Sequence, residues 1–142
     1  MRTLEGMFRW EANEIQHGPA RWKGLCMSHA RTAWGLPVQA PSALAFYDFV
    51  KRYHPNHLHH VDYRDVPAGA IVLDPHLSKY GHAWISGRHA GKGISSDYRR
   101  RGHLDYVPLN LPAWRHGDTK VWWTDWSHQG LLPVGPPRHH HK

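Results

Sequence analysis

The chain holds a single cysteine, Cys26, which stands where a helix is expected to begin. The apolar spacing over residues 25–34, stopped by Gly35 and Pro37, predicts that helix. A helix N-terminus offers free N–H groups and the positive end of the helix dipole, which stabilise a thiolate and can hold an oxyanion. Its position makes Cys26 a candidate nucleophile, although a lone cysteine usually serves as a small buried apolar residue.

A general base for this thiol is expected at His82, at the head of the strand-like segment 81–86. A strand holds an imidazole rigidly, and Gly81 leaves space for a ligand beside the ring. A Cys–His pair also needs a third polar group that fixes the imidazole tautomer. The return strand of the following hairpin supplies either Asp97 or Ser96, because strand alternation lets only one of them face the site. Asp97 is preferred, since a carboxylate also stabilises the imidazolium.

Other histidines compete with His82, because the chain has 15 of them. His29 lies one helical turn after Cys26, but a side chain there points along the helix, so a packing role is favoured. The histidines of segment 54–60 lie near Asp62 and Asp65, and imidazole and carboxylate are zinc ligands. Their spacing is not that of the helix that binds a catalytic zinc ion. We therefore expect this segment to form the rim of the substrate cleft rather than a metal site.

The eight tryptophans bring a large apolar area, most of which is expected in the core. Trp84 is two residues beyond His82 and shares its face of the strand, and Trp22 precedes the nucleophile by four residues. Trp22, Trp84 and Tyr80 are therefore the aromatic residues predicted to line the site and contact a substrate.

The chain carries a formal charge of +7, from 18 Lys and Arg against 11 Asp and Glu. The arginine run 99–101, with Arg88 and Lys92, is expected to make one side of the hairpin basic. A cationic surface attracts polyanions, among them the anionic polymers of a bacterial cell wall. No predicted helix carries the basic stripe that base-specific recognition requires, so no specific nucleic-acid partner is expected.

The order of elements predicts an α+β protein, with helices first and antiparallel strands afterwards. One cysteine excludes an internal disulfide, and no apolar run reaches the roughly 20 residues that span a bilayer. Residues 1–23 are expected to be irregular, 57–69 a polar loop, 1–134 a single domain and 135–142 a flexible His-rich tail. The expected helices are 25–34 and 42–53, and the expected strands are 70–73, 81–86, 94–98, 104–107 and 121–126.

Six short segments between residues 22 and 133, taken in their order along the chain, resemble the papain-like cysteine hydrolases of the CHAP and NlpC type. The resemblance looks closest to the small forms carried by actinobacterial phages. The resemblance spans about residues 20–134 and depends on order and spacing rather than on any single motif. One departure is Met27-Ser28 after the cysteine, where many relatives have glycine. The matching segments read WKGLCMSHAR at 22–31, PAGAIV at 67–72, GHAWIS at 81–86, ISSD at 94–97, WTDWS at 123–127 and GLLP at 130–133.

The resemblance implies a papain-like fold, in which N-terminal helices pack on an antiparallel sheet of about five strands. It implies Cys26 as nucleophile, His82 as base and Asp97 (or Ser96) as orienting residue, in a monomer that needs no cofactor and no metal. The implied substrate is peptidoglycan, cut within the stem peptide or at the N-acetylmuramoyl-L-alanine amide.

The N-terminus lacks the apolar stretch of a signal peptide. This fits a phage lysin made in the host cytoplasm, which acts at the cell wall after release by another protein or as part of a virion. Two alternatives remain open. One is a toxin or transferase that acts on amides outside the cell wall, and the other is a non-catalytic structural or binding phage protein on the same scaffold.

Overall fold

The computed structural model describes residues 1–37, 42–111 and 113–140. It is an α+β structure, as the order of elements predicts. Its helices are α1 (Leu4–His17), α2 (Cys26–Ala33) and α3 (Ala43–Tyr53), with short 3-10 turns η1 (Pro55–His57), η2 (Tyr63–Asp65) and η3 (Ala113–His116). Its strands are β1 (Leu58–Asp62), β2 (Ile71–Asp74), β3 (His82–Ser86), β4 (Lys92–Ser96), β5 (Leu104–Pro108), β6 (Lys120–Thr124), β7 (Trp126–Ser127) and β8 (Gly130–Leu131).

Six strands form one sheet in the order β1-β6-β2-β3-β4-β5, and the paired neighbours run antiparallel. β7 and β8 form a separate two-stranded hairpin. β2 lies inside the sheet, and all four of its residues are buried. Such a strand reads as a continuous apolar run, which is why its position could be predicted from sequence.

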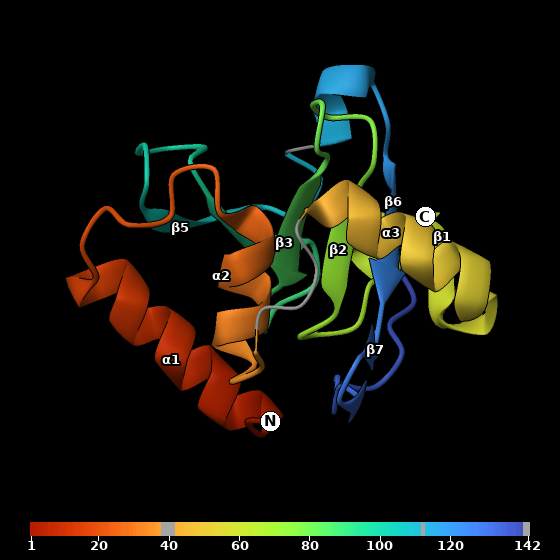
Figure 1. The fold of residues 1–142 in the computed structure, drawn as a ribbon, viewed down its shortest axis with the longest axis horizontal. Helices are drawn as coiled ribbons and strands as arrows, with labels where there is room; N and C mark the ends of the chain where they lie inside the picture. The colour runs from red at the N-terminus through yellow and green to blue at the C-terminus, as the bar shows by residue number, and fades with distance from the viewer. Residues whose placement is uncertain (38–41, 112, 141–142) are drawn as a thin grey trace.

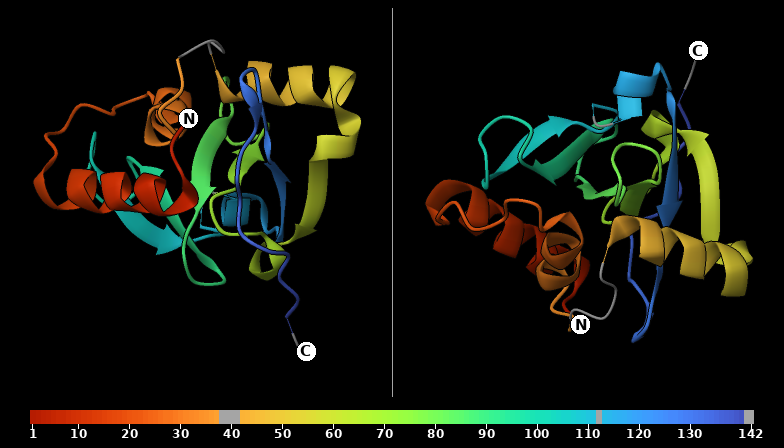
Figure 2. Two further views of the ribbon diagram at one scale, coloured as in Figure 1. Left: turned by 90° about the horizontal axis from the view of Figure 1, so that it is seen from below. Right: turned by 45° about the horizontal axis from the view of Figure 1, so that its top comes forward.

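The three helices cover one face of the sheet (Figures 1 and 2). α2 packs on β3, α3 on β2 and α1 beside α2 and β5. The strand pleat divides β3 between two cores, because Ala83 and Ile85 belong to the helix-side cluster while Trp84 belongs to a cluster on the other face. No helix within the described residues has the length and apolarity that a bilayer crossing requires.

The two predicted helices are present with nearly the predicted bounds. The side-chain oxygen of Ser42 accepts a hydrogen bond from the Ala45 N–H at 3.0 Å, so it caps α3 as expected. α2 has no side-chain cap, and Cys26 is its first residue. The predicted placement of Cys26 at a helix start is therefore confirmed.

Helix α1 is a correction, because residues 1–23 were predicted to be irregular. Thr3 caps the helix by accepting from the Gly6 N–H at 3.0 Å. The buried positions of α1 are Met7, Phe8 and Glu11, and the fully buried Glu11 interrupts the apolar spacing that sequence reading depends on.

Strand β1 is a second correction, since its residues fall in the predicted polar loop 57–69. It pairs along its whole length with β6. His59 stacks on Trp123 with ring centroids 4.3 Å apart, and His60 stacks on Trp122 at 4.2 Å. These imidazoles serve as flat packing surfaces, a role that their polarity conceals in the sequence.

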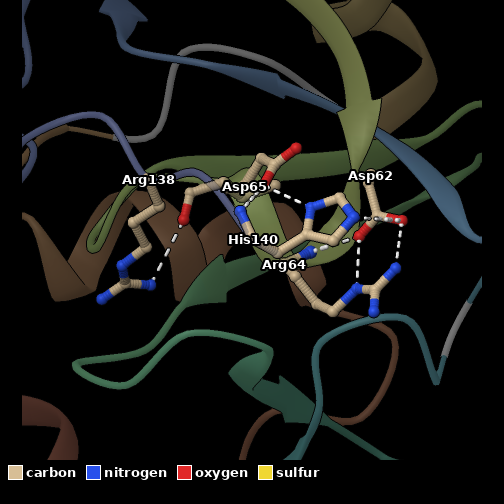
Figure 3. A network of polar contacts seen from close by, with 6 residues as sticks. Asp62, Arg64, Asp65, Arg138 and His140 are labelled. Atoms are coloured by element: carbon tan, nitrogen blue, oxygen red, sulfur yellow. Dashed lines mark hydrogen bonds and ion pairs between the residues drawn. The ribbon is translucent and has the colours of Figure 1, made fainter. Parts of the chain in front are cut away.

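The C-terminal segment was predicted to be loose, but the structure holds residues 135–140 against the body of the protein. Arg138 donates to the carbonyl oxygens of Val66, Gly87 and Arg88. His140 approaches Asp65, with its backbone N–H at 2.8 Å and its Nδ1 at 2.7 Å from the same carboxylate oxygen (Figure 3). These contacts hold the segment, because the Arg138 and His140 side chains reach carbonyl and carboxylate oxygens of the β1–β2 and β3–β4 connections.

This polar network predicts an acid-dependent stability. The Arg64 guanidinium lowers the pKa of Asp62 from 3.8 to about 2, with a smaller contribution from His140. A folded pKa below the unfolded one stabilises the native state above pH 3.8, and the effect is lost as pH falls through about 2. Because Arg64 is solvent-exposed, solvent screening keeps the loss of stability small. The free energy of unfolding, measured with urea at several pH values, is expected to depend less on pH in Asp62→Asn than in the wild type over this window.

Asp48→Asn, at an exposed position on α3, is the matched control and should leave the pH dependence as in the wild type. Equal slopes for Asp62→Asn and the wild type would show that the network adds nothing to stability.

Candidate active site

Four of the predicted site residues line one cavity of about 400 Å³, namely Cys26, His82, Asp97 and Tyr80. The cavity lies where the N-terminus of α2 meets the start of β3. The rest of its wall comes from the residues just before α2, the first turn of α2, the start of α3 and the turn before β3. These lining residues are Gly24, Leu25, Met27, Ser28, Ser42, Ala43, Ser78 and Gly81.

The thiol of Cys26 sits against the backbone of β3, because α2 packs on that strand. Burial raises its pKa above the usual value of 9.0. The backbone N–H groups of Ala83, Met27 and Cys26 act in the opposite direction, and the charge of Asp97 adds to the increase. The sequence predicts a thiolate stabilised by the helix terminus, but at this site desolvation outweighs that stabilisation.

The imidazole of His82 is held by Ser95, a residue that sequence reasoning missed. Nε2 of His82 lies 2.8 Å from Oγ of Ser95, and that hydroxyl donates to the Ser96 carbonyl at 3.3 Å. Two tautomers fit this contact, because the hydroxyl can accept from an Nε2–H or donate to an unprotonated Nε2. The tautomer protonated at Nε2, in which Nδ1 is the basic nitrogen, leaves the hydroxyl proton for the Ser96 carbonyl. Tyr98 packs edge-on against the ring at a centroid distance of 5.1 Å.

Asp97 lies in the predicted cavity but makes different contacts from those expected of an orienting residue. Its carboxylate accepts hydrogen bonds from the N–H groups of Gly24 and Gly102. Continuing the register that pairs Ile85 with Ile94 would bring Asp97 opposite His82. However, Asp97 has a φ of 70° and has left the strand, so its carboxylate reaches neighbouring loops. A direct role toward His82 stays a prediction.

Ser96, the alternative third residue, is fully buried, and its Oγ has no hydrogen-bond partner among the described residues. Strand alternation places Ser96 and Asp97 on opposite faces, as predicted. Ser95 lies two residues before Asp97 and therefore shares its face, but it was not among the residues predicted from the sequence. A serine that contacts a histidine from a neighbouring strand has no characteristic spacing in the sequence, so only the structure could reveal this contact.

Gly81 is needed before His82, but for a different reason from the one predicted. Its φ is 71°, and an added Cβ would lie 3.0 Å from both the Asp74 carbonyl oxygen and the Leu44 nitrogen. A side chain at this position would therefore meet the backbone at the start of α3, while Gly81 itself also lines the cavity. This close approach also sets the position of one cavity wall.

Two of the three predicted substrate-binding aromatic residues are core residues. Trp84 is fully buried and donates to the Leu109 carbonyl at 2.7 Å. Trp22 is 6% exposed and donates to Glu14 at 2.8 Å. The pleat and the packing of α1 direct these rings into the two cores. Tyr80 is 61% exposed at the cavity, so it alone of the three is available to a substrate.

His29 has the packing role that was favoured for it. Its Nε2 lies 2.7 Å from the Glu11 carboxylate, and both side chains are buried. Its ring stacks with Trp10 and meets Trp22 edge-on.

The histidines of segment 54–60 are not at the rim of the cleft. They lie along η1 and β1 at the far edge of the sheet from β4 and β5, and they stack on tryptophans or contact Asp125. Across the described ranges, no group of three or more His, Cys, Asp or Glu side chains is arranged to hold a metal ion.

The site thus combines a half-buried thiol, an imidazole in contact with the Ser95 hydroxyl and backbone N–H groups beside the sulfur. Such groups can support nucleophilic attack on a carbonyl carbon and stabilise the resulting oxyanion. No family model matches the chain, and no curated protein or solved structure shows a significant match to it.

The raised pKa of the thiol predicts how Cys26 reacts in the resting protein. The rate of alkylation by iodoacetamide is expected to rise with pH through a midpoint above 9.0. Asp97→Asn is expected to lower that midpoint, because it removes a negative charge that disfavours the thiolate. Mass-spectrometric labelling rates measure both.

Asp118→Asn, at an exposed position remote from the cavity lining, serves as the control. A pH-independent plateau of fast labelling near neutral pH would contradict this prediction, since it would reveal a thiolate–imidazolium pair already formed at rest.

Proposed function

We propose that this protein is a cysteine hydrolase that cleaves an amide bond of peptidoglycan. The observation that carries the proposal is that Cys26 and His82 line one cavity while Oγ of Ser95 lies 2.8 Å from Nε2 of the imidazole. A nucleophile, a base and a group that orients the base are the minimum for thiol catalysis of acyl transfer. A papain-like arrangement of the helices and the sheet is part of the same proposal.

The raised pKa of the thiol determines when the proton moves in the proposed reaction. Because the resting thiol is neutral, Nδ1 of His82 takes its proton as the sulfur attacks the carbonyl carbon. The carbonyl oxygen becomes an oxyanion, which the N–H groups beside the sulfur stabilise. Collapse breaks the C–N bond, and the imidazolium gives its proton to the leaving amine. Water then hydrolyses the thioester, with His82 as base, and regenerates the thiol.

Peptidoglycan is proposed as the substrate because the sequence resembles cell-wall hydrolases of the CHAP and NlpC type. Two further properties agree with it. The chain is cationic, at +7, which favours attraction to an anionic wall. The exposed ring of Tyr80 at the cavity offers an apolar face on which a sugar or peptide plane can stack.

The first test is digestion of purified peptidoglycan by the wild type, Cys26→Ala and His82→Ala. The wild type should release new amino termini that mass spectrometry identifies, while both variants should lose at least about a hundredfold in rate. New amines without free muramic lactyl carboxylates indicate an endopeptidase, and their joint appearance indicates an amidase.

His29→Gln controls for loss of a histidine outside the cavity and should retain activity wherever it folds. Equal products from the wild type and Cys26→Ala would remove the thiol from the mechanism. Absence of product from a folded wild type would reject peptidoglycan cleavage and favour a binding protein.

The second test compares two neighbouring serines of β4. Ser95→Ala is expected to lower kcat/KM about tenfold or more and to change its acid limb, because the imidazole loses the partner that fixes its tautomer. Ser96→Ala is the matched control, since Ser96 is equally buried and its hydroxyl is unpartnered in the described structure. It should leave the pH profile unchanged.

Thermal unfolding of both serine variants separates a positioning role from a loss of stability. A large kinetic defect in Ser96→Ala with none in Ser95→Ala would overturn the assignment of Ser95.

A further inference from the structure

We propose that a second cavity binds a small organic carboxylate with an apolar body, independently of the Cys26 site. This cavity lies between α1, the turn joining β3 to β4, and β5, and its volume is about 390 Å³. It shares no lining residue with the cavity at Cys26. Its size falls within the range of small-molecule sites in proteins. We call it the α1–hairpin cavity.

The inner wall of the α1–hairpin cavity is apolar. Phe8 and Ile94 are 5% and 1% exposed, and Ala12 and Tyr106 complete this surface. Tyr106 is 54% exposed, so its ring extends the apolar surface toward solvent. A ligand that covers these groups removes apolar area from water, which favours an aromatic or aliphatic body.

The rim of the same cavity is cationic. Arg9, Arg88, Lys92 and His89 line it, and none of its lining residues among those described is acidic. Apolar floor and cationic rim together select an amphiphile whose charged end is negative. A neutral apolar molecule would leave the rim unused, and a polyphosphate would leave the floor exposed to water.

A carboxylate already occupies one of these cations within the protein. The two oxygens of Glu5 lie 2.6 and 2.7 Å from the terminal nitrogens of Arg88, which is the bidentate geometry that a guanidinium prefers. The guanidinium of Arg88 lies over the Phe8 ring at 4.7 Å. The rim therefore presents carboxylate-binding groups directly above the apolar floor.

Glu5 also indicates where a ligand would bind. It engages Arg88 closely, while its distance to Nε of Arg9 is 3.8 Å. The carboxylate of a ligand would therefore be held by Arg9 and Lys92, with Glu5 competing for the third cation. Removal of the Glu5 charge should strengthen binding, which is a gain that nonspecific loss of structure cannot imitate.

The test is a titration of the full chain with 3-phenylpropionate, followed by amide chemical shifts in NMR. Shifts are expected in α1 and in the β3–β4 turn, and the uncharged 3-phenylpropan-1-ol should bind about tenfold more weakly. The double variant Arg9→Gln/Lys92→Gln should weaken carboxylate binding by a similar factor, whereas Glu5→Gln should strengthen it. Lys51→Gln, an exposed change on α3, is the charge-matched control and should have no effect.

Ala12→Leu is a steric control, because it fills the floor without changing charge, and it should weaken both ligands. Several results would overturn the proposal. These are the absence of shifts at millimolar ligand, shifts confined to other surfaces, equal affinity for the acid and the alcohol, or weaker binding in Glu5→Gln. Loss of hydrolase activity in the Cys26 variants would leave this binding unchanged, so the two proposals fail separately.

Discussion

The cleft depends on the carboxylate of Asp97, which joins two loops that are remote in sequence. Its oxygens accept from Gly24, just before the cysteine, and from Gly102, in the turn before β5. A further bond from the Trp22 N–H to the Gly102 carbonyl at 2.8 Å ties the same two segments. The left-handed backbone at Asp97 is the conformational cost of aiming one carboxylate at both loops. These bonds hold the segment that leads into α2 against the loop between β4 and β5.

A buried polar contact between α1 and α2 supports this arrangement. Glu11 of α1 and His29 of α2 form a buried contact, and one polar atom of each, Oε2 and Nδ1, has no hydrogen-bond partner within the described structure. A buried pair of this kind contributes little net stability, but breaking it is costly because one group is left unpaired. It therefore favours a single docking of α1 on α2, against the helix that begins with Cys26.

The two cavities differ in the kind of ionisable group that lines them. At the Cys26 cavity, burial keeps the thiol neutral, and proton transfer to His82 is part of the proposed attack. At the α1–hairpin cavity, exposed arginine and lysine side chains lie at the rim of an apolar floor. The first cavity is the one proposed for bond cleavage, and the second is the one proposed for reversible binding of an anion.

The sequence by itself determined the α+β order, helices α2 and α3, the positions of β2 to β6, and the placement of Cys26 and His82 at the starts of α2 and β3. Each depends on local periodicity, on capping by Ser42 or on breakers such as Gly35. Helix α1, strand β1, the ordered tail and the Ser95 contact were decided only by tertiary structure. In each of them a polar side chain packs against or contacts a residue outside its own element, as Glu11 contacts His29 and His60 stacks on Trp122, and local patterns do not record such contacts.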